Sequence, residues 1–154
     1  MKIGKYEFIF LQTIRPTTDD EGKILRYKPQ SRYNNKKGLK LNEFGDGEFC
    51  RFELDKAESA KGVYAWVVHE DNEPIYIGET DNLKKRFKTG YGIISPRNCY
   101  AGGQLTNCKM NKVVLDYYTA GKSIDIYFLK TDDYKKVELE LLNSINTIYN
   151  KKNN

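Results

Sequence analysis

The sequence predicts a small α/β (α+β) protein, with a three-stranded antiparallel sheet flanked by helices and preceded by an extended basic arm. Residues 61–80, KGVYAWVVHEDNEPIYIGET, hold two apolar runs joined by a polar connector, which is typical of an antiparallel hairpin. Apolar residues then alternate over residues 123–129 and recur at helical spacing on both sides of that segment. From residue 62 onward, the predicted order is therefore strand, strand, helix, loop, helix, strand, helix.

The arm, residues 1–60, is predicted to be irregular with one or two strands. Turn-forming stretches such as TTDDEGK and GDGE divide it into short extended pieces, including residues 6–14 and 49–54. Between Lys23 and Lys40 it carries seven cations and two tyrosines but no acidic residue. This run is either a solvated face or a surface for a polyanion. Residues 61–150 are predicted to form the main domain.

Composition limits the class of protein. The chain of 154 residues is 39% hydrophobic and 31% charged, which is typical of one soluble globular domain. It has no apolar run of about 20 residues and no recognisable secretory signal, so we expect a cytoplasmic protein with no membrane partner. Its three cysteines form no CxxC pair, which favours reduced structural thiols.

Within the hairpin, the strands are predicted to be residues 62–68 and 74–78. With the connector centred on Asp71, Tyr64 lies opposite Gly78 and Trp66 lies opposite Tyr76. Both tyrosines then share one face of the sheet with a position that has no side chain. This arrangement predicts a small polar pocket.

The helices that follow place two charged residues near the core. In the segment DNLKKRFK, residues 81–88, Arg86 borders the buried face marked by Leu83 and Phe87. A second helix follows a glycine-rich loop, and a last helix extends to about residue 149. In that last helix Glu138 falls within the apolar arc.

A carboxylate on an apolar face needs a partner, because an unpaired buried charge costs several kcal/mol. Glu138 is therefore either paired in a salt bridge, with Arg86 or a lysine, or a ligand for a hard divalent metal ion. Glu140, in contrast, falls outside the arc.

Together these motifs resemble the GIY-YIG nuclease family. The resemblance covers residues 61–150 and rests on GVY at 62–64, YIG at 76–78, Thr80, Asn82, Leu83, Arg86 and Glu138. It implies a GIY-YIG-like sheet with flanking helices and metal-dependent hydrolysis of DNA phosphodiesters, with Mg²⁺ or Mn²⁺ and no organic cofactor. It also implies a catalytic set with Tyr64 as base, Arg86 on the phosphate and Glu138 on the metal: Tyr64, Tyr76, Arg86, Tyr91, Glu138 and Asn150.

The chain departs from the family pattern at three positions. Val63 replaces an isoleucine. Many relatives have a histidine or tyrosine one helical turn after the arginine, where this chain has Gly90, and Tyr91 comes one residue later. Glu79 occupies a position where basic or amide residues are common, and the sequence assigns it no role.

The chain is as compact as the stand-alone restriction enzymes that it resembles, so we expect a site-specific endonuclease acting on double-stranded DNA. We predict DNA contacts from the arm, the first helix and the glycine-rich loop, at Lys84, Lys85, Arg97, Asn98, Gln104, Asn107, Arg26 and Arg32. The arm serves DNA contact or dimerisation, and a palindromic site requires a homodimer or two successive binding events. Two alternatives stay open: a low-specificity or structure-directed phage or repair nuclease, and a non-catalytic nucleic-acid-binding module.

Overall fold

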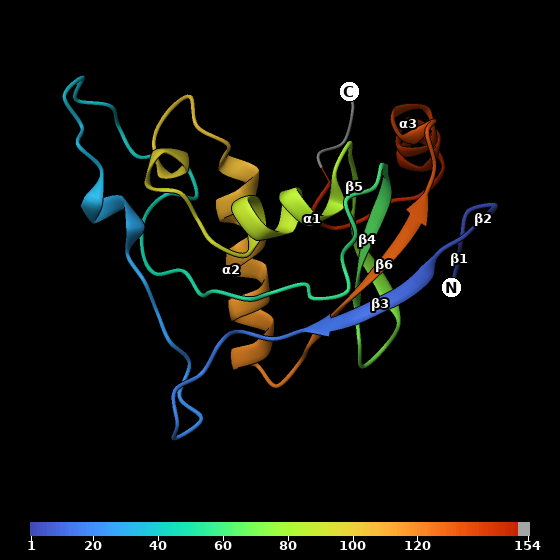
Figure 1. Cartoon of the computed structure of the whole chain (residues 1–154), viewed down its shortest axis with the longest axis horizontal. Coiled ribbons are helices and arrows are strands. Elements are labelled where there is room, and N and C mark those ends of the chain that lie inside the picture. The colour runs from blue at the N-terminus through green and yellow to red at the C-terminus, as the bar shows by residue number, and fades with distance from the viewer. Residues whose placement is uncertain (151–154) are drawn as a thin grey trace. The chain divides into compact units, whose positions relative to one another are not determined.

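The computed structural model describes residues 1–150, which form two compact units (Figure 1). The first unit comprises Met1–Ile14, Asp55–Lys84 and the chain from Lys122 on. The second unit comprises Arg15–Leu54 and Lys85–Gly121. Residues of the predicted N-terminal arm are thus found in both units. The predicted mixture of helices and antiparallel strands is confirmed.

The first unit is built on a four-stranded antiparallel sheet. Its order is β3-β6-β4-β5, with the strands β3 (Ile9–Ile14), β6 (Ile124–Lys130), β4 (Gly62–Val68) and β5 (Glu73–Thr80). The prediction of three strands was wrong, because the N-terminal stretch pairs with β6 and brings Ile9 opposite Phe128. A pairing between segments so distant in sequence leaves no local pattern. Two short strands, β1 (Lys2–Ile3) and β2 (Tyr6–Glu7), pair separately.

The predicted hairpin register is confirmed, since Tyr64 pairs with Gly78 and Trp66 with Tyr76. The opposite face of the sheet packs against helix α3 (Tyr134–Ser144). There the buried core consists of Ile3, Phe8, Val63, Ala65, Val67, Ile77, Val137 and Leu141. The predicted helix to residue 149 was too long, because Ile145 adopts extended backbone angles (φ −131°, ψ 153°).

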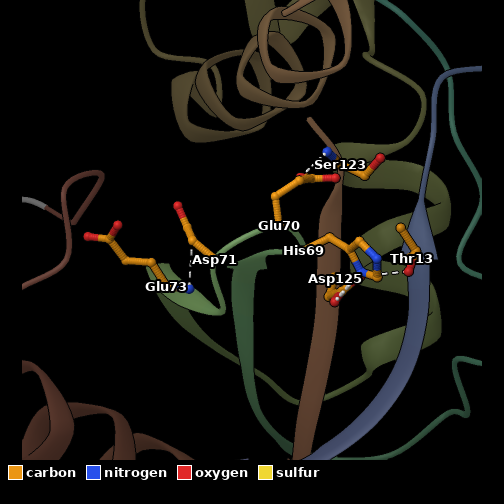
Figure 2. A network of polar contacts seen from close by, with 7 residues as sticks. All are labelled: Thr13, His69, Glu70, Asp71, Glu73, Ser123 and Asp125. Carbon is orange, nitrogen blue, oxygen red and sulfur yellow. Dashed lines mark hydrogen bonds and ion pairs between the residues drawn. The ribbon is translucent and has the colours of Figure 1, made fainter. Parts of the chain in front are cut away.

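A polar network in the first unit surrounds the chain's one histidine (Figure 2). Asp125 of β6 is buried, and it accepts a hydrogen bond of 2.6 Å from the Thr13 hydroxyl on β3. The Nδ1 atom of His69, just after β4, lies 2.9 Å from an oxygen of the same carboxylate. The network therefore joins the hairpin connector to two strands of the sheet, and the buried carboxylate of Asp125 has hydrogen-bond partners.

The second unit contains no named strand among its described residues and depends on helices and on hydrogen bonds from buried amides. Its main helix is α2 (Leu105–Thr119), and its short turns are η1 (Pro29–Arg32), η2 (Phe87–Tyr91) and η3 (Pro96–Cys99). Asn111 of α2 is fully buried; its side chain accepts from the Cys50 N–H at 3.0 Å and donates to the Tyr91 carbonyl at 2.9 Å. Such bonds satisfy backbone groups of irregular segments that no sheet supports.

Helix α1 (Leu83–Arg86) is shorter than the predicted helix over residues 81–88, because the chain continues from it as the π-helical turn η2. Across residues 1–150 we find no helix with the length and apolar character needed to cross a bilayer.

Candidate active site

In the first unit, the ring of Tyr64 lies over Gly78. A Cβ atom built on Gly78 would be 2.4 Å from both Cζ and Oη of Tyr64, so only glycine permits this close approach. The predicted pocket beside Gly78 is therefore filled by the tyrosine ring. Tyr64 is almost fully buried, at 1% exposure, whereas Tyr76 is half-buried and meets Trp66 edge to face with ring centres 6.2 Å apart.

Asn150 is bound to the free edge of strand β5. Its side chain accepts a hydrogen bond from the Ile77 N–H and donates one to the Ile77 carbonyl, both at 2.8 Å. Thr147 donates its hydroxyl to the Asn150 side-chain oxygen, and the Tyr149 N–H bonds the Ile75 carbonyl at 3.0 Å. The segment after α3 therefore runs along the edge strand and fixes the amide of Asn150 there.

Glu138 reaches the same strand two residues further along. Its carboxylate accepts a hydrogen bond from the backbone N–H of Glu79 and is half-buried. Burial and the neighbouring negative charge of Glu79 raise the pKa of Glu138 to about 6, although the backbone hydrogen bond acts in the opposite direction. Ile77, Gly78 and Glu79 thus contact Asn150, Tyr64 and Glu138 respectively.

The carboxylate of Glu138 could take part in holding a metal ion. Within its own unit Glu138 forms no ion pair with another described residue, and the nearby Glu79 adds negative charge. A divalent cation would remove both penalties, and carboxylates are the ligands that Mg²⁺ prefers. No group of three or more His, Cys, Asp or Glu in residues 1–150 is placed to hold a metal. A cation at Glu138 would therefore depend on water or substrate oxygens as well.

In the second unit, Arg86 is held between Tyr91 and Asn107. Its guanidinium carbon lies 3.9 Å from the centre of the Tyr91 ring, and its Nη1 donates a hydrogen bond to the Asn107 side-chain oxygen. A Cβ atom on Gly90 would be only 2.6 Å from the same Nη1, so the glycine leaves room for the arginine. The side chain of Arg86 is thus fixed from several sides.

The late position of Tyr91 has a structural explanation. A π-helical turn takes one residue more than an α-helical turn, and the Gly92 N–H bonds the carbonyl of Phe87, five residues earlier, at 2.8 Å. This turn brings Tyr91, rather than Gly90, under Arg86. Tyr91 is fully buried.

Asn107, predicted to contact DNA, is buried at 1% exposure. Its amide nitrogen donates to Asn98 at 2.9 Å and to Gln104 at 3.0 Å, while its oxygen accepts from Arg86. This network could not be predicted, because the spacing of two residues along the chain does not reveal that their side chains meet.

The other predicted DNA-contact residues are in varied settings. Arg97 donates to the carbonyls of Tyr100 and Ala101, so it braces its own loop. Lys84 and Lys85 are exposed, and Arg26 and Arg32 line a cavity of the second unit.

Comparison of the chain with protein-family models, curated proteins and solved structures found no match.

Proposed function

We propose that this protein is a metal-dependent endonuclease of restriction type that hydrolyses phosphodiesters in double-stranded DNA. The observation that supports it best is that three predicted site residues contact consecutive positions of β5, Tyr64 from the sheet face opposite α3, and Glu138 and Asn150 along the free edge of the strand. Tyr64, Glu138 and Asn150 come from three different parts of the chain, yet they contact Gly78, Glu79 and Ile77. A purely structural role gives no reason for a half-buried carboxylate that forms no ion pair with a described residue of its own unit.

Each residue has a role that its setting permits. Glu138 would hold Mg²⁺ or Mn²⁺, and the bound metal would supply Lewis-acid stabilisation of charge on phosphate oxygens. Tyr64, in its deprotonated phenolate form, would accept a proton from the attacking water and return to the neutral phenol. Asn150 would orient this part of β5, since both polar atoms of its amide are bound to Ile77.

Arg86 is assigned to the phosphate by the family resemblance, and its planar guanidinium suits an anion. Tyr91 and Asn107 are positioning residues in this proposal, because both are buried and both contact the guanidinium. Stabilisation of the growing charge by such a donor is worth about 3 to 4 kcal/mol. Arg86→Ala should therefore reduce cleavage by about 10²- to 10³-fold.

The test is digestion of a long DNA with Mg²⁺. Discrete fragments support a restriction enzyme, a smear supports the low-specificity alternative, and intact DNA supports the non-catalytic one. In the same assay Glu138→Gln should abolish cleavage while DNA binding persists. Glu140→Gln is the matched control, because Glu140 lies on the same helix and bonds Lys5 and Tyr6 at the surface. Full activity of Glu138→Gln would refute the assignment.

A further inference from the structure

A basic cavity in the second unit is lined by two of the predicted DNA-contact residues, Arg26 and Arg32, and by other cations. It has a volume of about 420 Å³, within the range of small-ligand sites. Four of its lining residues are cationic and none is acidic. The full lining is Arg26, Tyr27, Lys28, Pro29, Ser31, Arg32 and Arg51. Sequence reasoning identified Arg26 and Arg32 but missed Arg51, which is remote from the basic run.

A short antiparallel bridge brings Arg51 to this run. Tyr27 and Phe49 exchange two backbone hydrogen bonds of 2.8 Å. Arg51 lies two residues beyond Phe49, at the diagonal position where long side chains reach across a strand pair. Its guanidinium carbon is 4.0 Å from the centre of the Tyr27 ring. The Thr17 N–H also bonds the Arg51 carbonyl at 2.7 Å, so the backbone on this side of the cavity is fixed.

The other side of the cavity is the turn η1. The Ser31 hydroxyl donates to the Lys28 carbonyl at 2.7 Å, which closes the turn on itself. Gln30 donates to the Gly47 carbonyl at 2.6 Å and accepts from the Tyr100 hydroxyl at 2.8 Å. Pro29 is buried. The cations are therefore carried on a braced backbone rather than on a free loop.

The charges of this cavity are not neutralised within residues 1–150. The ion pairs of this part of the chain involve the N-terminus, Lys5, His69 and Lys130, and none of the four cavity cations. Four like charges around one space repel each other, and an anion there would relieve the repulsion. Arginine forks match two phosphate oxygens at once.

We propose that this cavity binds backbone phosphate of double-stranded DNA, without reading the bases. The inference rests on the proposed function only in taking DNA as the partner. Arg51 and Arg26 are expected to form charge-assisted hydrogen bonds to phosphate oxygens, with Lys28 and Arg32 adding charge at the exposed rim. The contribution should be independent of sequence, and added salt should weaken it.

The experiment measures binding of a fluorescent DNA duplex by anisotropy, in EDTA and over a series of salt concentrations. Each phosphate contact contributes about −0.9 to the slope of log affinity against log salt. Arg26→Ala and Arg51→Ala should each make the slope less negative by about 0.9, and the double variant by about 1.8. Lys122→Ala is the matched control, because it removes one exposed cation that does not line the cavity. Its slope should equal that of the wild type.

Equal slopes for Arg51→Ala and Lys122→Ala would overturn the proposal, as would an unmodified protein that does not bind the duplex. If Arg51→Ala fails to fold, Arg26→Ala and Lys28→Ala decide, since both side chains are exposed. A calorimetric titration with inorganic phosphate distinguishes a site for a small anion from a site for DNA. If Arg51→Ala binds phosphate more weakly but keeps the wild-type salt slope for DNA, the proposal is also refuted.

Cleavage is scored separately from binding. Binding that depends on the cavity without cleavage by the wild type would refute the proposed function and leave this inference standing. Cleavage with unchanged slopes would do the reverse.

Discussion

The guanidinium of Arg86 lies 3.9 Å from the centre of the Tyr91 ring, although Tyr91 follows five positions later. The π-helical turn between them makes this contact, and Gly90 leaves the space for it. Many members of the GIY-YIG family, which the sequence resembles, have a histidine or tyrosine at the position that Gly90 occupies. In this chain the extra residue of the turn carries the aromatic ring to the arginine instead.

Gly90→Ala should reduce cleavage by about 10²-fold with little loss of stability. The added methyl group would meet the Nη1 atom at the far end of the Arg86 side chain and not the backbone, so the guanidinium would be displaced from its contacts while the backbone stays. Misplacement of a catalytic group by about 1 Å has an effect of this size. Single-turnover cleavage and thermal denaturation measure the two quantities. Thr89→Ala, at an exposed neighbouring position, should leave both unchanged. An unchanged cleavage rate in Gly90→Ala would contradict the role given to this glycine.

Tyr91→Phe should keep cleavage within about twofold, whereas Tyr91→Leu should reduce it about tenfold. Phenylalanine retains an aromatic face for the guanidinium of Arg86, and leucine does not. The Tyr91 backbone stays in place in both variants because Asn111 holds its carbonyl. Cleavage rates of the two variants, compared at equal folded fraction, give the answer. Equal losses in both would mean that the hydroxyl, and not the ring, carries the function.

The pH dependence of stability should reveal Glu138. Its pKa is about 6 in the folded protein and near 4.5 when unfolded, so folding favours the protonated form. Its contribution is fully present below about pH 4.5 and is lost as the pH rises through about 6. In the absence of metal, Glu138→Gln should therefore be more stable than the wild type at pH 7, by about 1 kcal/mol after allowing for solvent screening.

Urea denaturation at several pH values in EDTA measures this difference. Glu140→Gln is the matched control. Hydrogen bonds from Tyr6 and Lys5 lower the pKa of Glu140, so the stability that Glu140 contributes is lost as the pH falls, opposite to Glu138. Mg²⁺ should stabilise the wild type, but not Glu138→Gln, above pH 6. The wild type and Glu138→Gln are compared by how their free energies of unfolding change between pH 4.5 and 6. The same change in both proteins would contradict the raised pKa of Glu138.

Asp125→Ala should destabilise the protein by about 1 to 3 kcal/mol and leave the cleavage rate of the folded protein unchanged. The substitution removes the acceptor of the Thr13 hydroxyl and the partner of His69 (Figure 2). Urea denaturation gives the stability, and cleavage at low temperature gives the rate. His69→Ala should cost less, because the histidine side chain is 52% exposed. If Asp125→Ala loses cleavage but keeps wild-type stability, the network of Thr13, His69 and Asp125 takes part in catalysis instead.

Much of the first unit followed from the sequence, because its signals are local. The connector centred on Asp71 was enough to place Tyr64 opposite Gly78, and helical spacing separated Glu138 from the exposed Glu140. Residues 6–14 were expected to be extended, but the place of Ile9–Ile14 as the fourth strand of the sheet was missed because this strand pairs with a segment more than a hundred residues away. The position of Tyr91 also escaped prediction, since a π-helical turn differs from an α-helical one by a single hydrogen-bond shift.

The segment Ile145–Tyr149 was expected to be helical, but helix α3 ends at Ser144. Because the chain leaves the helix at Ile145 and turns at residues 148–149, Asn150 binds Ile77 while Glu138 meets the Glu79 N–H. Tertiary contacts with the edge of β5 thus override the helical pattern of this segment. The like charges of Glu79 and Glu138 became visible only once both residues were placed.

The binding of Asn150 to Ile77 also bears on self-association. An uncovered edge strand offers its backbone groups to the strand of another molecule, which leads to aggregation. Tyr149 and Asn150 cover β5 at Ile75 and Ile77, so a second copy cannot extend the sheet at these residues. Subunits that pair on a palindromic DNA site would have to meet through another surface. Asn150 therefore blocks strand pairing at the edge of β5 as well as belonging to the proposed site. Its removal would make the protein more prone to aggregate.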